Sequence, residues 1–331
     1  MSTRTPTRTA PETPLHDCRR AYAATLTDIA RADERLVIVT NDSIGSSNLG
    51  GFHEELPSRL INVGIAEQNQ VGVAAGLENG GKIPVVSCAG SFLSARATEQ
   101  IKIDAAYSHR HMLLCAQSPG LAYGPLGSTH HSAEDVSIMR SIPEMTVIVP
   151  ADPAETAGAV RWAYFELDGP AYIRISRMKV PALHGEDYVF TPRAAVLRGG
   201  GGGGEGADLT IIANGVTVHR AVDAADRLAA EGVRARLLSV PVVKPLDEDA
   251  VLAAARETGR IVTVEEGTVK GGLGGAVAEL VTERCPVPVR RIGVPDEFAP
   301  TGSEAWLMDH WGISADGIIA AARELVAGPA A

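Results

Sequence analysis

Aromatic residues are scarce in this chain of 331 residues, and so is positive charge. Only 4% of the residues are aromatic, whereas 45% are apolar and 35 are glycine. This composition favours closely packed helices and short turns over an aromatic-rich β-sandwich. The formal net charge is −10 and the basic residues are scattered. The sequence therefore predicts no nucleic-acid surface, and any phosphate site must be local.

Paired cysteines and long apolar runs are also absent. Cys18, Cys88, Cys115 and Cys285 form no CxxC motif, and Cys88 and Cys115 end apolar runs typical of buried strands. We therefore expect reduced thiols and a cytoplasmic protein. No window approaches the roughly 18 apolar residues that a membrane span needs. Residues 1–15, rich in Thr, Pro and Arg, predict a disordered leader rather than a signal peptide.

Apolar runs alternate with helical patterns along the rest of the chain. The predicted strands cover residues 36–39, 60–63, 83–87, 112–115, 146–149, 171–175, 209–213, 235–240, 261–265 and 287–292. The predicted helices cover residues 17–31, 71–77, 95–106, 135–140, 154–165, 218–231, 248–258 and 276–283, with two more near the C-terminal end. Such alternation predicts an α/β fold of two doubly wound domains with mostly parallel sheets.

Six consecutive glycines, residues 199–204, mark the boundary between the predicted domains. We assign residues 16–185 to the first domain, 186–206 to a Gly-rich linker and 207–331 to the second domain, because a glycine run favours no regular element. No Lys-Ser/Thr pair follows the run, which argues against a phosphate loop. The chain also lacks a strand–GxGxxG–helix unit with a downstream acidic residue, which argues against a nicotinamide cofactor.

A second glycine cluster, residues 271–275, opens a predicted helix. Two explanations fit it: a phosphate bound at the helix N-terminus, or close packing of the helix on a strand. We prefer close packing. His109 and His111 flank Arg110 but lack further ligands, so the sequence predicts no metal site on this chain.

The strongest functional signal lies at residues 59–70, Arg-Leu-Ile-Asn-Val-Gly-Ile-Ala-Glu-Gln-Asn-Gln. A short strand turns through Gly64 into a helix, which puts Glu67 at a strand-to-helix turn where α/β proteins bind ligands. A solvated carboxylate that favours the helix dipole is the alternative. The string Val-Gly-Ile-Ala-Glu-Gln, however, resembles the pyrimidine-domain signature of transketolase-like thiamine diphosphate enzymes. In that family the Glu hydrogen-bonds the aminopyrimidine ring and drives formation of the reactive carbanion.

The resemblance extends from about residue 16 to residue 325. Val-Glu-Glu-Gly at 264–267, the glycines at 271–275 and Arg-Ile-Gly-Val at 291–294 are similar to the C-terminal domain of transketolases. The family's Gly-Asp-Gly signature, which grips the diphosphate through Mg²⁺, does not occur in the chain. The resemblance therefore implies one subunit of a split transketolase. Its partner, an N-terminal diphosphate-binding subunit, would hold Mg²⁺ in an α2β2 assembly around a dimer of this chain.

The resemblance also implies which residues bind thiamine diphosphate. Glu67 matches the catalytic glutamate, whose acid-base role is typically worth 10²–10⁴-fold. Phe92 matches an aromatic residue that stacks on the pyrimidine, with core packing as the alternative. Asp42 matches an aspartate near the cofactor, although an Asx turn would explain it as well. Ile65 lies in the signature string itself.

Substrate-binding residues follow from the same resemblance. His130, in Gly-Ser-Thr-His-His, matches a histidine that contacts sugar hydroxyls, and Arg177 matches an arginine that binds the substrate phosphate. A planar guanidinium suits this role because it can bind phosphate bidentately. Arg19 and Ser46 fall close to two further phosphate contacts, and Arg20 could replace Arg19.

The chain departs from the family in the same loop. Transketolases usually have an Asp three residues before the Thr of the Thr-His motif, where this chain has Leu126, and a His upstream, near Ser118 here. Leucine neither donates nor accepts a hydrogen bond, so this contact to the donor sugar must be absent or supplied from elsewhere. We therefore expect a specialised transketolase that handles ordinary ketose phosphates less well.

Three alternatives remain open at this stage. A β subunit of a 2-oxoacid dehydrogenase shares both domains, but Thr129-His130 and Arg177 favour ketol transfer. A deoxyxylulose phosphate synthase normally carries all three domains in one chain. A non-catalytic partner subunit would not need a carboxylate at Glu67, where packing would accept Gln.

Overall fold

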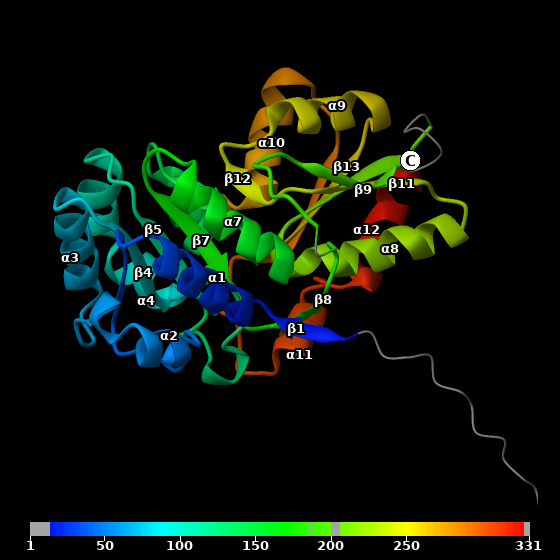
Figure 1. Ribbon diagram of the computed structural model, residues 1–331. Coiled ribbons are helices and arrows are strands. Elements are labelled where there is room, and N and C mark those ends of the chain that lie inside the picture. The colour runs from blue at the N-terminus through cyan, green and yellow to red at the C-terminus, as the bar shows by residue number, and fades with distance from the viewer. Residues whose placement is uncertain (1–13, 186, 200–205, 328–331) are drawn as a thin grey trace, which may run out of the picture.

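The structure, a computed structural model, describes residues 14–185, 187–199 and 206–327. Two helix-covered sheets lie side by side (Figure 1). The first sheet has seven strands in the order β12-β6-β7-β5-β4-β2-β3, all parallel except β12, which pairs antiparallel with β6. Its strands are β2 (Leu36–Thr40), β3 (Leu60–Asn62), β4 (Ile83–Ala89), β5 (Leu113–Gln117), β6 (Thr146–Ile148), β7 (Ala171–Ile175) and β12 (Val242–Lys244).

Helices cover this sheet on both faces because its strands are apolar on both sides. Strand β2 reads Leu-Val-Ile-Val-Thr and is buried throughout, as expected for a parallel sheet between two helical layers. One face packs on α1 (Cys18–Ala32), α2 (Gly50–Glu55) and α7 (Pro153–Phe165). The other packs on α3 (Glu67–Asn79), α4 (Gly90–Arg96), α6 (Asp135–Ser141) and the π-helix η2 (Ile101–Tyr107), which follows the short α5 (Thr98–Gln100).

The second sheet has five strands in the order β14-β13-β10-β11-β9. They are β9 (Ala195–Gly199), β10 (Leu209–Ala213), β11 (Ala235–Ser239), β13 (Ile261–Thr268) and β14 (Val289–Val294), and only β9 runs antiparallel to its neighbour. Its helices are α8 (Val218–Ala230), α9 (Glu248–Thr258), α10 (Leu273–Arg284), α11 (Glu304–His310) and α12 (Ala315–Ala327). Helices α8 and α12 pack on one face, and α9 and α10 pack on the other.

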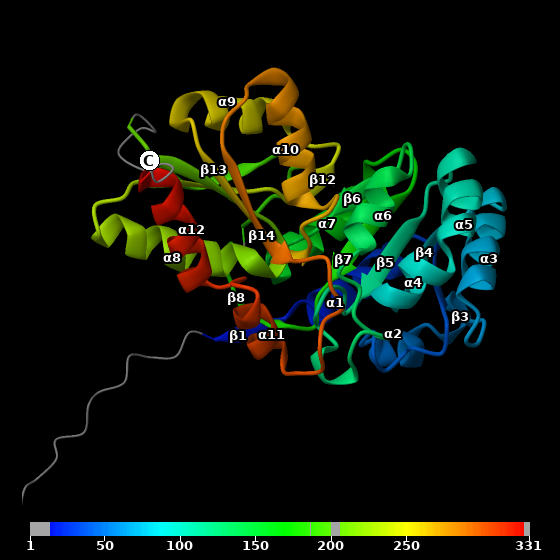
Figure 2. The same cartoon turned by 180° about the vertical axis from the view of Figure 1, so that it is seen from behind.

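One core runs through both halves of the chain. It joins Val71 of α3 and Met139 of α6 to Val251 of α9 and Val277 of α10. The halves also exchange main-chain contacts, since β12, from the second half, is an edge strand of the first sheet. The edge of the first sheet that ends in β6 and β12 is therefore held against the second half, and the reverse view shows this side of the molecule (Figure 2).

Two of these strands were missed by the sequence analysis. Strand β9 lies inside the predicted linker 186–206, and β12 crosses from the predicted second domain to the first sheet. Both are short edge strands of five and three residues, too short to show a hydrophobic period. The predicted helix at 95–106 is also divided, because α4 ends at Arg96 and the π-helix begins at Ile101.

Several other predictions meet the structure directly. Cys88 and Cys115 are fully buried, which confirms their assignment to strands of the core. Most of the predicted leader, residues 1–13, and the glycines 200–204 lie outside the described residues. Leu15 begins the two-stranded sheet of β1 (Leu15–Asp17) and β8 (Lys179–Pro181). Among the described helices, none has both the length and the apolar character needed to cross a membrane.

Candidate active site

Most predicted site residues lie beyond the carboxyl ends of the first sheet's parallel strands. This edge is where open α/β sheets bind ligands. The residues are Asp42 after β2, Glu67 after β3, Phe92 after β4, Ser118, Leu126 and His130 after β5, and Arg177 after β7. Since neighbouring parallel strands end at the same edge, residues distant in sequence are brought together there.

Glu67 is the first residue of α3 and is 4% exposed. Two donors reach the same carboxylate oxygen, Oε1: Asn41 Nδ2 at 2.9 Å and Arg96 Nη1 at 3.1 Å. The carboxylate is thus held by a buried amide and by a guanidinium whose side chain is half exposed. The second oxygen, Oε2, is the one left for a ligand. The solvated-carboxylate alternative is wrong, because Glu67 is buried and paired.

An aromatic group adjoins this carboxylate. The Arg96 guanidinium carbon lies 4.1 Å from the centre of the Phe92 ring, a cation–π contact. The Phe92 ring meets the His130 ring edge-on, with centres 5.3 Å apart. Phe92 is only partly buried, so it does not serve as plain core packing. The structure therefore brings together three of the predicted residues, Glu67, Phe92 and His130, in one row of contacts.

Tyr123 continues the row to Arg177. Its ring centre lies 5.8 Å from that of His130, and the Arg177 guanidinium carbon lies 5.0 Å from the Tyr123 ring centre. The row runs from a buried anion at Glu67 to a cation at Arg177, with aromatic rings between them. A ligand along it would meet an acceptor at one end, flat apolar surfaces in the middle and a cation at the other end.

The remaining predicted residues lie apart from this row. Asp42 is exposed and accepts a hydrogen bond from Asn62 Nδ2 at 3.0 Å. Ile65 is 76% exposed. Arg19 donates to the Ser46 carbonyl at 2.8 Å, so these two do lie together, but its guanidinium is also bound to Asp17.

The loop after β5 holds the last two predicted residues. Ser118 is fully buried in a left-handed conformation, with φ of 52°, and its hydroxyl has no hydrogen-bond partner among the described residues. Leu126 ends the 3-10 turn η3 (Gly124–Leu126) and is 53% exposed. Leu126 therefore presents an apolar side chain where the family has a carboxylate.

Three contacts of the site were missed by the sequence analysis. Asn41 and Arg96 both bind Glu67, and Tyr123 joins His130 to Arg177. Asn41 lies 26 residues before Glu67 and Arg96 lies 29 residues after it, so no local pattern links them. An aromatic residue in the glycine-rich loop was the one available signal, and it pointed to Tyr123.

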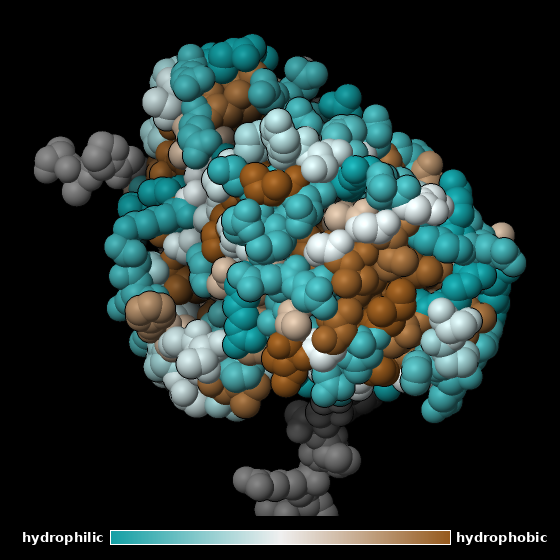
Figure 3. Space-filling view, turned by 90° about the vertical axis from the view of Figure 1, so that its left-hand side faces the viewer, coloured by the Kyte–Doolittle hydropathy of each residue, from teal (hydrophilic) through white to brown (hydrophobic). Residues whose placement is uncertain are grey.

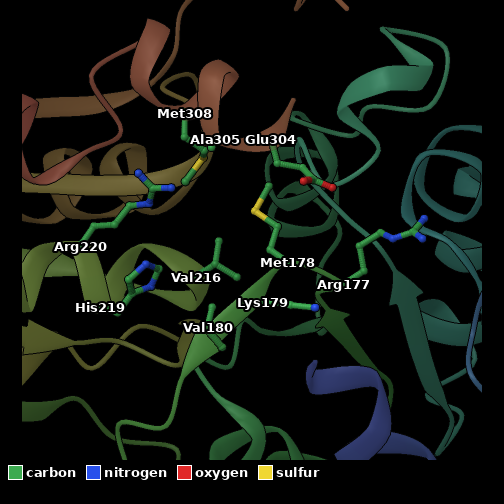
Figure 4. Close-up of a pocket in the computed structure, with 10 residues that line it drawn as sticks. All are labelled: Arg177, Met178, Lys179, Val180, Val216, His219, Arg220, Glu304, Ala305 and Met308. Carbon is green, nitrogen blue, oxygen red and sulfur yellow. The ribbon is translucent and has the colours of Figure 1, made fainter. Parts of the chain in front are cut away.

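A cavity of about 370 Å³ opens behind Arg177, between the two halves of the chain. Its charged and polar lining comes from Arg177, Lys179, His219, Arg220 and Glu304 (Figure 4). The Arg177 guanidinium points away from the other lining residues in this view. Burial, followed by the nearby positive charge of Arg220, lowers the pKa of His219 to about 4. His219 is thus held neutral at this junction.

The glycine cluster at 271–275 is explained by packing. The Glu265 carboxylate accepts hydrogen bonds from the main-chain N–H groups of Leu273 (2.7 Å) and Gly274 (2.8 Å), at the N-terminus of α10. A Cβ at Gly272 would collide with that carboxylate. The chain's own anion thus stands where a phosphate would bind, and the packing explanation is confirmed.

Metal ligands do not gather in the described part of the chain. No group of three His, Cys, Asp or Glu side chains there is arranged to hold a metal ion. His109 lies on the surface beside Glu144, with Nδ1 and Oε2 3.2 Å apart. His111 Nε2 lies 2.9 Å from the Ala163 carbonyl. Both histidines have structural contacts.

Comparison with known protein families agrees with the geometry. The family "Transketolase, pyrimidine binding domain" matches residues 16–182, and "Transketolase, C-terminal domain" matches residues 203–318. Half of the chain or more is covered by the first of these alone, and it contains the whole row from Glu67 to Arg177.

Relatives match almost the whole chain. An apulose-4-phosphate transketolase subunit of Phocaeicola vulgatus is 41% identical over 311 residues, which cover 93% of this chain and 97% of the relative. The 6-deoxy-6-sulfo-D-fructose transketolase subunit SqwH of Clostridium sp. is 41% identical, with coverage of 94% of both proteins. The 1-deoxy-D-xylulose-5-phosphate synthase of Heliobacterium modesticaldum is 38% identical, but this chain spans only 46% of it.

A solved structure described as "Split gene transketolase, inactive beta4 tetramer" has the same fold. It superposes with a TM-score of 0.83 at 38% identity, and the match covers 94% of this chain and 98% of that one. The relatives of matching length are separately encoded transketolase subunits, and both domains occur here in the same order. The chain therefore belongs to the transketolase family and corresponds to one subunit of a split transketolase.

Proposed function

We propose that this chain is the pyrimidine-binding subunit of a thiamine diphosphate-dependent transketolase that moves a two-carbon ketol unit from a ketose to an aldose. The observation that carries the proposal is the buried Glu67 carboxylate beside Phe92, in a chain matched along its length by transketolase subunits. When bound, thiamine diphosphate supplies the carbanion chemistry, whereas the protein supplies orientation and electrostatics.

The residues at the carboxylate fit an aminopyrimidine. Glu67 Oε2 is free to exchange a proton with a ring nitrogen, while Asn41 holds Oε1. Phe92 offers a partly buried aromatic face. Arg96 covers that face at present, but its side chain is 50% exposed and can turn to solvent when a ring takes its place. Asp42 and Ile65, both exposed on the loops after β2 and β3, are further candidates for contact with the cofactor.

The far end of the row suits a substrate with hydroxyl groups and an anionic end. The His130 ring is placed between Phe92 and Tyr123 to contact a sugar hydroxyl or to move its proton. Arg177 supplies the cation, with Arg19 and Ser46 as further contacts and Ser118 as a buried hydroxyl of the same loop system. Leu126 adds no polar group, which favours a less usual ketose or acceptor over common pentulose and hexulose phosphates.

A partner subunit completes the active site. We place the diphosphate and its Mg²⁺ ligands on a separate N-terminal transketolase subunit, in an α2β2 assembly in the cytoplasm. The face that carries α3 shows a broad apolar patch (Figure 3). Exposed residues of this region include Ile65, Ile103 and Tyr107, and Gly72 and Gly76 lie on the open side of α3. Such a surface fits a second protein chain.

Reconstitution tests the proposal. This chain is mixed with an N-terminal transketolase subunit of the same organism, thiamine diphosphate and Mg²⁺, and two-carbon transfer from ketose donors to aldoses is measured. We expect transfer by the complex and none by this chain alone. Robust turnover by the isolated chain would contradict the split enzyme. Pyruvate decarboxylation with lipoyl acylation would instead support a 2-oxoacid dehydrogenase subunit, and no turnover with any donor would support a silent partner.

The same assay tests the role of Leu126. Leu126→Asp supplies the carboxylate that transketolases usually carry, and a hydrogen bond to a charged group is worth about 1.5–3 kcal/mol. We therefore expect kcat/KM for xylulose 5-phosphate to rise by roughly 10- to 150-fold. Leu126→Ala, which removes the side chain without adding an acceptor, is the control and should not gain. Equal values for wild type and Leu126→Asp would show that Leu126 sets no specificity.

A further inference from the structure

The loop after β5 carries three residues of the site but little regular structure. Tyr123, Leu126 and His130 lie on it, and within it only Gly124–Leu126 form a helical turn. Such a loop needs contacts outside itself to present His130 at a fixed place. The second half of the chain supplies such contacts to the loop.

Glu266, in β13, is the charged residue at this contact. Its side chain is 4% exposed, and Oε1 accepts a hydrogen bond from the main-chain N–H of Leu121 at 2.6 Å. Gly120, in a left-handed conformation with φ of 62°, lies directly against the carboxylate. A Cβ at that position would collide with it, so the close approach depends on glycine.

Glu266 is itself held from the first half of the chain. Arg174 Nη1 donates to the Glu266 carbonyl at 2.7 Å. Arg174 is 5% exposed and forms an ion pair with the fully buried Asp135, with Nε and Oδ2 3.0 Å apart. Asp135 also accepts a hydrogen bond from the Tyr172 hydroxyl at 2.7 Å. The residue whose carboxylate binds the loop is therefore itself held by a buried network of Arg174, Asp135 and Tyr172.

Further along, the loop contacts the second half of the chain through neutral groups. Ser128 Oγ donates to the Ala299 carbonyl at 2.7 Å, and the Gly302 N–H donates to the Gly124 carbonyl at 3.3 Å. These partners belong to the second half, as Glu266 does. The second half thus borders the loop, with Glu266 at the start of the loop and residues 299–302 near its middle.

We propose that Glu266 is a positioning residue, which fixes the loop of residues 118–131 so that His130 and Tyr123 stand between Phe92 and Arg177. The second half of the chain then has a part in the reaction, although the row from Glu67 to Arg177 contains none of its residues. The effect on turnover rests on the function proposed above, whereas the effect on the loop does not.

Hydrogen–deuterium exchange on the full isolated chain tests the loop without any need for activity. Glu266→Ala removes the acceptor and leaves the Leu121 N–H unpaired, so we expect amides of residues 118–131 to exchange about tenfold faster or more. Glu266→Gln keeps an acceptor oxygen and should restore most of the protection. Glu265→Gln is the matched control, because Glu265 is equally buried and binds only the start of α10.

The reconstituted complex provides the kinetic test. Glu266→Ala should lower kcat/KM by roughly 10-fold or more, because a small displacement of His130 through the loop slows the reaction even though Glu266 itself is remote from it. Glu266→Gln should recover most of that loss, and Glu265→Gln should keep wild-type kcat/KM while it loosens residues 273–284. Unchanged exchange of the loop in Glu266→Ala, or equal kinetic losses in the Glu265 and Glu266 variants, would overturn the proposal. If amide exchange of the loop rises as expected but neither the wild-type complex nor any variant shows turnover, the proposed function is wrong and the positioning role is still supported.

Discussion

At the scale of single residues, Glu67 combines burial with a specific set of donors. Glu67→Gln keeps the shape and one acceptor but cannot exchange a proton, so we expect turnover of the complex to fall roughly 10²-fold or more. Circular dichroism and assembly should stay unchanged. Glu78→Gln is the matched control, because Glu78 lies on the same helix as Glu67, α3. This substitution breaks the 2.9 Å ion pair of Glu78 with Arg110 and leaves the site intact. Wild-type turnover by Glu67→Gln would disprove the acid-base role.

The residues of the site divide by how they could be predicted. Glu67, Phe92, His130 and Arg177 were proposed from short strings that resemble motifs of the transketolase family. Asn41, Arg96 and Tyr123 could not be assigned, since their roles depend on distances between loops. Asp42 and Ile65 stay predictions, because their exposed side chains make no contact with the row.

At the scale of elements, helix α3 starts with the buried carboxylate of Glu67, the proposed acid-base group, and has exposed glycines on its outer side. Gly76 is exposed and nothing lies within 4 Å of a Cβ placed there. Gly76→Ala should therefore stabilise the isolated chain by about 0.5–1 kcal/mol, the gain of Ala over Gly inside a helix. If a partner helix packs closely on this face, the added methyl group should weaken assembly.

Sedimentation velocity, with thermal unfolding of the same samples, checks both expectations for Gly76→Ala. Gly51→Ala is the matched control, because Gly51 is an exposed helical glycine with open space around it, on α2, which covers the opposite face of the sheet. Assembly as tight as wild type in both variants would remove α3 from the interface.

The interior strands of the two large sheets were predictable, whereas two of their four edge strands, β9 and β12, were not. Strands such as β2 and β10 are continuous apolar runs, which a buried parallel strand requires. Edge strands β9 and β12 are less completely buried than these and contain no such run. Their formation therefore depends on pairing with strands that lie far away in the sequence. The helix predicted at 95–106 contains no proline, and its separate segments all pack on α3.

At the scale of the whole molecule, the half-buried His219 and the buried Glu266, both at the junction of the halves, respond to pH in opposite senses. Burial lowers the pKa of His219 to about 4, below its ordinary 6.5, so its contribution to stability is present above pH 6.5 and is lost as the pH falls toward 4. Burial raises the pKa of Glu266 to about 7, although Arg174 and the Leu121 N–H oppose this, so its contribution falls as the pH rises from 4.5 to 7. Asp135 and Arg220 also face Glu266.

Comparison of variants separates the two effects. His219→Gln removes the loss of stability that protonation of His219 causes in acid. As the pH falls from 6.5 to 4, the wild type should therefore lose up to about 3 kcal/mol of stability relative to the variant. Urea unfolding at intervals across this range measures it, with His53→Gln, which changes an exposed histidine of α2, as the control. Because His219 lines the cavity between Arg177 and α11, its protonation places a second charge beside Arg220 at that junction. Acid should therefore loosen the contact between the halves first. A constant difference in the free energy of unfolding between wild type and His219→Gln at every pH would show that His219 is not held neutral there.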